Sequence, residues 1–236
     1  FLARGITGGA TTAGSGTIYL EKPGSQPQLL IRSSLAAPAI GSFTPVSSST
    51  VGGESLTLSR FVMNNAWAEF KGVKILQIMD ALQLTGANVL RDTAGAIHFP
   101  ANGADLPPGS DVTIATMTFP SASVLTLSSA TLRVSSLTAL GDVVVQGVSV
   151  LEQQSTAQWT LGSLLVKASG KVRHAANTSN KTYAVNRGVL NDLKIDMGGS
   201  VNVDGLGFPG GAATLAGSGP GAGQGSPGQN PSGRRR

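Results

Sequence analysis

Side chains capable of acid–base or metal chemistry are few and widely spaced in this chain. The two histidines, His98 and His174, have no partner at a metal-ligand spacing. The absence of cysteine excludes disulfides, thiolate metal sites and cysteine nucleophiles. No nucleophile elbow, phosphate loop or zinc signature occurs. We therefore expect no catalytic, cofactor-binding or metal-binding residue and no cofactor, with both histidines on the surface or in loops.

The carboxylates need a separate check, because many parallel β-helices cleave polysaccharides with a pair of Asp or Glu side chains. Asp192 and Asp196 could meet at one corner, but turn residues that bond their own backbone are the simpler interpretation. Asn202 and Asp204 offer two candidate oxygens where calcium takes about six or more, so we expect an Asx turn there. The acids are otherwise spread singly, mostly at expected turns: Glu21, Glu54, Glu69, Asp80, Asp92, Asp105, Asp111, Asp142, Glu152, Asp192, Asp196 and Asp204.

The charge of the chain does not point to a nucleic-acid partner. The formal net charge is +5, and Arg234, Arg235 and Arg236 at the end supply three of those charges. The other basic residues are scattered and do not alternate with aromatic residues as on a base-stacking surface. No apolar run approaches the roughly 20 residues of a membrane helix. We expect neither a nucleic-acid partner nor a membrane span, and we interpret Arg234–Arg236 as a solvated tail or a mark of processing or assembly.

Two further features concern processing and modification. The first residue is Phe1 rather than Met, which we interpret as the start of a processed product or of a fragment. Asn177 in "NTS" and Asn180 in "NKT" match the glycosylation sequon, which matters only in a eukaryotic secretory pathway.

Short alternating segments predict an all-β fold. Charged residues make up 12% of the chain and aromatic residues 5%, so its core must consist mainly of small aliphatic side chains. The segment 61–84 could be helical, but its "VKILQI", with Val73 and Ile75, fits a strand at least as well. Apolar residues at period two define the other strands: Ile18 and Leu20, Leu29 and Ile31, Leu56 and Leu58, Leu125 and Leu127, Leu132 and Val134, Val143 and Val145, Val148 and Val150, Leu164 and Val166 with Val172, Leu193 and Ile195, and Val201 and Val203.

The spacing of these strands predicts a right-handed parallel β-solenoid, or β-helix. Leu125, Val143 and Leu164 begin comparable units at intervals of about 20 residues, which is typical of a repetitive coil. The repeat is irregular, with segments 100–111 and 175–188 expected to loop out. The alternative is an antiparallel β-sandwich, although Asp204–Gly205 is the one clear two-residue hairpin signal.

Both ends of the chain are rich in glycine. We divide it into a glycine-rich N-terminal segment (1–16), a β-solenoid body (17–208) and a Gly/Pro/Ser-rich tail (209–236). The stretch "LNDLKIDMGGSVNVDGLGFPGG", followed by "GSGPGAGQG", resembles a pattern in large, repetitive bacterial surface and adhesin-like proteins, where such a stretch closes a run of coils before a glycine-rich segment. Phe208 stands where that pattern usually has tyrosine. "GSGTIYLE" resembles the strand that resumes after such a segment.

The resemblance implies a structural rather than enzymatic protein, located outside the cell or on its surface. Solenoids whose ends are not capped expose strand edges, and contacts that do not close on themselves build filaments. We therefore expect a fibre or surface-layer subunit that polymerises head-to-tail and adheres to surface glycans. The alternatives are a polysaccharide-acting β-helix enzyme and a phage tail-fibre module.

Overall fold

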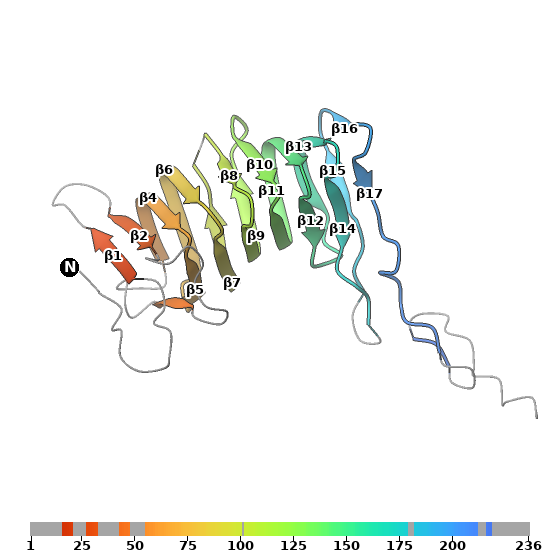
Figure 1. Cartoon of the computed structure of the whole chain (residues 1–236), viewed down its shortest axis with the longest axis horizontal. Coiled ribbons are helices and arrows are strands. Elements are labelled where there is room, and N and C mark those ends of the chain that lie inside the picture. Colours follow the sequence, from red (N-terminus) through yellow and green to blue (C-terminus); the bar gives the residue numbers. More distant parts are fainter. Residues whose placement is uncertain are drawn as a thin grey trace, which may run out of the picture.

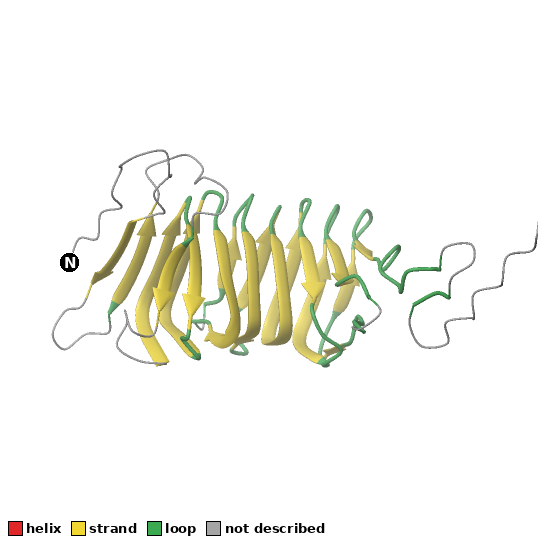
Figure 2. Ribbon diagram, turned by 90° about the horizontal axis from the view of Figure 1, so that it is seen from below, coloured by secondary structure: helices red, strands yellow, loops and turns green. Residues whose placement is uncertain are grey.

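The described part of the chain forms one stack of β-coils. The computed structural model describes residues 16–20, 27–32, 43–47, 55–100, 102–178, 182–211 and 216–218. Over these residues it contains 17 strands and no helix. Figure 1 shows the strands following one another along a single long axis in chain order, and Figure 2 shows the same stack turned by 90°. The glycine-rich segments expected at 1–16 and 209–236 lie almost wholly outside the described residues.

The strand bounds are as follows: β1 (Gly16–Leu20), β2 (Gln28–Arg32), β3 (Thr44–Ser47), β4 (Ser55–Asn64), β5 (Trp67–Lys71), β6 (Ile75–Thr85), β7 (Val89–His98), β8 (Ala104–Leu106), β9 (Asp111–Phe119), β10 (Val124–Ser128), β11 (Thr131–Gln146), β12 (Val150–Gln153), β13 (Trp159–Val166), β14 (Lys171–His174), β15 (Arg187–Val189), β16 (Leu193–Ile195) and β17 (Ser200–Val201).

Each coil has three faces, and β11 runs through all of them. Its residues 131–134 pair with β9 and β12 on face 1, and residues 136–139 continue along face 2 beside β9 and β13. Residues 142–146 pair with β10 and β13 on face 3. The chain therefore winds through faces 1, 2 and 3 before the next coil begins.

The ladders confirm the parallel β-solenoid, and the antiparallel sandwich was the wrong alternative. Val112, Leu132, Leu151 and Val172 are consecutive partners on face 1, so these coils are 20, 19 and 21 residues long. The described pairings are parallel except at one place: β1 pairs antiparallel with β2 at the N-terminal end of face 3.

The corner between face 3 and face 1 has a repeated backbone conformation. At each corner of this kind from β4–β5 to β16–β17, one residue adopts a left-handed conformation, which turns the chain without a long loop. Side chains seal this corner: Asn88 donates to the Thr85 carbonyl, and the Ser149 hydroxyl accepts from the Ala130 amide. The residues with positive φ at this corner are Asn65, Gly86, Gly109, Ser129, Gly147, Ser169 and Gly198.

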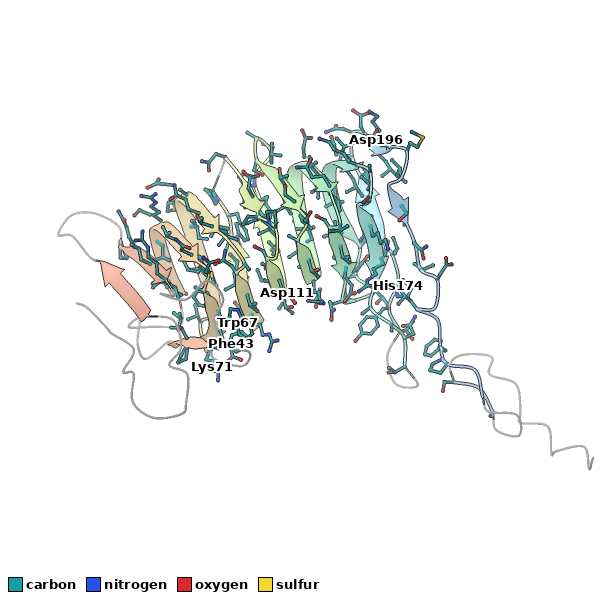
Figure 3. All side chains as sticks on the ribbon, in the orientation of Figure 1. Phe43, Trp67, Lys71, Asp111, His174 and Asp196 are labelled. Carbon is teal, nitrogen blue, oxygen red and sulfur yellow. The ribbon has the colours of Figure 1, made fainter. Side chains whose placement is uncertain are left out.

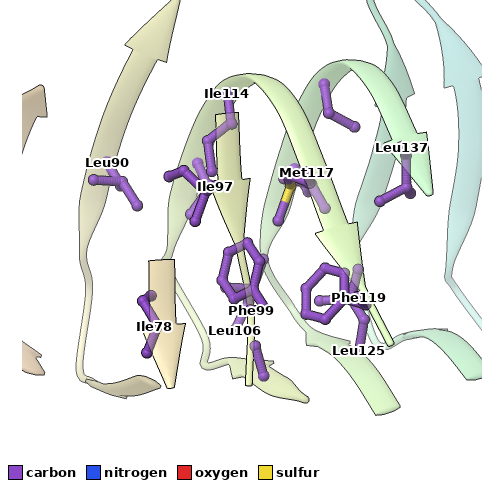
Figure 4. Packing of buried hydrophobic residues seen from close by; sticks show 14 of the residues in the cluster. Ile78, Leu90, Ile97, Phe99, Leu106, Ile114, Met117, Phe119, Leu125 and Leu137 are labelled. Carbon is purple, nitrogen blue, oxygen red and sulfur yellow. The ribbon is translucent and has the colours of Figure 1, made fainter. Parts of the chain in front are cut away.

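The core consists of inward side chains stacked from coil to coil. Leu125 and Leu127 lie beside Val143 and Val145, and all four are fully buried. Figure 4 shows Phe99 and Phe119 in this interior, their rings stacked with centroids 4.3 Å apart. Such columns of aliphatic groups provide most of the stabilisation, about 1.5–3 kcal/mol for each fully buried side chain.

The strand interpretation of segment 61–84 was confirmed, since the segment holds the end of β4, β5 and most of β6 and no helix. Three finer expectations were wrong. Ile75 is exposed, and Leu76 and Ile78 face inward instead. The expected loop at 100–111 contains β8, which pairs with β10. Val148 lies exposed at the corner, and Leu151 is the inward residue of β12, because the left-handed Gly147 changes the alternation. Of the expected loop at 175–188, the described residues 175–178 and 182–186 lie between β14 and β15, whereas Arg187 and Gly188 belong to β15.

Candidate functional site

The two histidines lie in different environments. His98 is the last residue of β7 on face 2, where it pairs with Thr118 of β9. His174 was expected on the surface or in a loop, but it is buried at the end of β14 (Figure 3). Its Nδ1 lies 2.6 Å from the Ala175 carbonyl oxygen, so the ring nitrogen donates to that carbonyl. In the described part of the chain, no three His, Asp or Glu side chains gather as metal ligands would.

Charged side chains on face 1 form a network, in which Glu152 is more buried than the other carboxylate, Asp111. Arg173 donates to Glu152 through Nε and Nη2, both 2.7 Å from Oε2. Arg133 Nε lies 3.7 Å from Glu152 Oε1 and bonds Asp111 with its other end. This network joins the coils from β9 to β14. Its carboxylates are held by arginines, which favours a structural use over proton transfer.

The other polar residues singled out by sequence serve local structure. Asn202 Oδ1 accepts from the Asp204 amide at 2.7 Å, which confirms the expected Asx turn. Asp196 forms an ion pair with Lys194 at 3.1 Å. The Asn177 side chain is buried and bonds the backbone of Tyr183 through both ends of its amide, so glycosylation there would break this contact. Asn180 lies outside the described residues.

The last coil exposes inward positions that are buried in the coil before it. Leu193 and Ile195 pair with the buried Leu164 and Val166, yet they are 57% and 46% exposed. On face 1, Val201 stands beside the buried Val172 and is 43% exposed. No described coil covers these inward columns. We call the following exposed residues the open end: Leu190, Leu193, Ile195, Met197, Val201 and Val203.

The backbone at the open end also has hydrogen-bonding groups without a ladder partner along one side. Among the described residues, β15 and β16 pair only with β13, and β17 pairs only with β14. The outer edges of these three strands therefore present N–H and C=O groups with no ladder partner. Such edges favour the addition of further strands.

The first coil, unlike the last, has its inward side chains covered. Its inward residues Leu29, Ile31, Val46 and Leu58 are all buried. The edge of β2 on face 3 is occupied by β1. The two ends of the stack are thus unequal, with one closed over its core and the other open.

Arg187 stands in an inward column at the start of the last coil. It pairs with Trp159, which is fully buried, and its guanidinium carbon lies 4.4 Å from the centre of that ring. Nη1 donates to Gln153 Oε1 at 3.3 Å, whereas Nε and Nη2 are buried without a hydrogen-bond partner. Burial lowers the pKa of Arg187 to about 10.

Sequence reasoning predicted uncapped ends, but it did not identify the residues of the open end or the half-buried Arg187. Leu193 and Ile195 have the same alternation as the core strands before them, so their pattern carries no sign of exposure. Arg187 precedes a Gly and a Val in a segment that was expected to loop out. Only the register, which places Arg187 beside Trp159, shows that it stands in a core column.

Comparisons with known proteins gave no relative of this chain. No known family matches it, and no similar sequence was found among the curated proteins. The solved structures likewise contain no match. Over the described residues, no helix is long and apolar enough to cross a membrane. The chain is therefore placed by its fold alone, as a parallel β-solenoid.

Proposed function

We propose that the protein is a structural subunit that joins a larger assembly through its open end. The observation that carries this proposal is the exposure of Leu193, Ile195 and Val201, each of which continues a buried column. Covering these side chains would remove apolar surface from water, at roughly 25 cal/mol per Å². The open backbone edges of β15 to β17 would gain hydrogen bonds in the same contact.

The assembly we propose is head-to-tail. The N-terminal strand β1 has a free edge among the described residues, since it pairs only with β2. A second copy placed along the same axis would bring its β1 to β16. Because β1 runs opposite to the other strands of face 3, that pairing would be antiparallel. The contact is heterologous, so repeating it would give a filament.

A structural role outside the cell or at its surface agrees with the chemistry of the chain. Asp111, Glu152 and Asp196 are each held by an arginine or a lysine, which leaves them poorly suited to acid–base work. The resemblance of residues 193–211 to repetitive bacterial surface proteins supports the location and an adhesive or fibre-forming role.

Sedimentation velocity over a range of protein concentrations tests the proposal. The wild-type chain is expected to associate as concentration rises. The double variant Leu193→Asp, Ile195→Asp is expected to stay monomeric, because it places charges on the open end. Met79→Asp is the matched control, since Met79 is an equally exposed apolar residue away from that end. Both variants should keep the wild-type circular dichroism spectrum.

Two outcomes would contradict the proposal. One is a wild-type chain that stays a monomer at the highest concentration reached. The other is a double variant that associates as strongly as wild type. A discrete trimer of unchanged size at all concentrations would instead favour the phage tail-fibre module.

A further inference from the structure

The ladder on face 3 is interrupted between β6 and β8. All other neighbouring strands on this face are hydrogen-bonded, from β2 and β4 at one end to β13 and β16 at the other. The second half of β6 and β8 are neighbours in the stack but share no ladder pairing. A groove of about 490 Å³ lies at this interruption. Its volume is within the range of small-molecule sites.

The floor of the groove is aliphatic. Leu82 and Leu84 hold the same inward positions as Phe61 and Met63 in the preceding coil, which are fully buried. Leu82 and Leu84 are only partly buried, because β8 does not close over them. Val124 adds an exposed apolar side chain to the lining.

The walls of the groove carry polar side chains that are free to bind. Thr85, Asn102, Asp105 and Thr126 all line it. None of these four makes a side-chain hydrogen bond or ion pair with another described residue. They come from three successive coils: Thr85 from β6, Asn102 and Asp105 from β8 and the turn before it, and Thr126 from β10. Together they supply a carboxylate, an amide and two hydroxyls around an apolar floor.

This lining matches the chemistry of a sugar. A carboxylate accepts hydrogen bonds from neighbouring hydroxyls, an amide both donates and accepts, and a threonine hydroxyl does either. The aliphatic floor suits the C–H face of a pyranose ring. No lysine or arginine lines the groove, so an anionic polymer is not favoured, and the single carboxylate gives too few ligands for a calcium ion.

An inserted peptide strand fits less well. Cα atoms of β6 and β8 approach within 8 Å of one another. A strand between them would need its two neighbours about 9.6 Å apart, twice the usual strand spacing. Cleavage is not favoured either, because glycosidases use two carboxylates and Asp105 is the only one in the lining.

We propose that this groove is a binding site for a neutral oligosaccharide, with Asp105, Asn102 and Thr126 as its hydrogen-bonding residues. The site lies on β6, β8 and β10, well before the open end in the stack. Sugar binding there does not depend on self-association, and either property could fail without the other.

The test is a binding screen of the labelled full chain on immobilised neutral oligosaccharides of hexoses and N-acetylhexosamines. The best saccharide is then titrated in solution against variants. Asp105→Ala is expected to weaken binding at least about tenfold, since it removes hydrogen bonds to a charged group. Thr126→Trp should abolish binding by filling the groove. Asp142→Ala, an exposed carboxylate on the same face but outside the lining, is the matched control and should bind as wild type.

Three results would overturn the proposal. The first is that no neutral saccharide binds at concentrations up to about 1 mM. The second is binding that survives both Asp105→Ala and Thr126→Trp in variants with the wild-type circular dichroism spectrum. The third is that an array of extended peptides, screened in parallel, competes for the groove while saccharides do not.

Discussion

Replacing Arg187 with methionine should make the protein more stable, which is the reverse of the usual effect of a mutation in a core column. The pKa of Arg187, lowered to about 10 by burial, corresponds to about 3 kcal/mol of desolvation at neutral pH. Arg187→Met removes that cost and keeps an unbranched stem over Trp159. It also loses the cation–π contact and the hydrogen bond to Gln153, about 1 kcal/mol each. The net gain is about 1 kcal/mol.

The sign of the pH dependence follows from the same group. Because its pKa is lower in the folded than in the unfolded chain, the unfolded chain binds more protons once pH rises above about 10. The cost of the buried charge is present in full below that pH and decreases above it. The advantage of Arg187→Met over wild type should therefore shrink between neutral pH and about pH 10.5.

Urea denaturation followed by circular dichroism at both pH values measures this difference. Arg173→Met is the control, because Arg173 is paired with the buried Glu152 and its loss should destabilise by about 2 kcal/mol. Unfolding of Arg187→Met at a lower urea concentration than wild type at neutral pH would show that the charge of Arg187 has no net cost. A difference between the two proteins that is unchanged at about pH 10.5 would show that the difference does not come from the charge of Arg187.

Three further predictions concern single positions and are measured by the same denaturation assay. Gly141→Ala should destabilise the folded chain by about 2–3 kcal/mol, since a Cβ there would lie 1.9 Å from the Ser123 carbonyl oxygen. Gly207→Ala is the control and should change stability by less than about 0.5 kcal/mol, because a Cβ there would meet no atom within 4 Å. Glu152→Gln should cost about 2 kcal/mol, because two arginines lose their shared carboxylate but stay partly solvated; a neutral result would contradict the network on face 1. Val148→Thr should be nearly silent, within about 0.5 kcal/mol, whereas a large loss would mean that this exposed corner is packed in solution.

Local alternation was sufficient to predict most of the core. Leu125 and Leu127, Leu132 and Val134, and Val143 and Val145 face inward as their period-two pattern indicates. The interval of about 20 residues then identified the parallel stack. These features could be predicted because each inward column repeats the same short pattern of apolar and polar residues.

Corners and long-range contacts were harder to predict from the sequence. The shift at Val148 follows from the left-handed Gly147, and a serine or an asparagine takes the equivalent place at Ser129 and Asn65, so no single residue type marks the corner. The strand β8 was missed because three residues give almost no periodic signal. The groove beside β6 depends on a hydrogen-bond ladder that stops, which no local pattern records.

The difference between the closed first coil and the open last coil affects the order in which the coils unfold. A coil covered on one side only has fewer contacts to lose, so strands β15 to β17 should exchange their amide hydrogens fastest and detach first. Protection should then increase coil by coil toward the middle of the stack. Any partner that covers Leu193 and Val201 would slow amide hydrogen exchange in the coil beneath them. It would thereby delay unfolding from the C-terminal side of the stack.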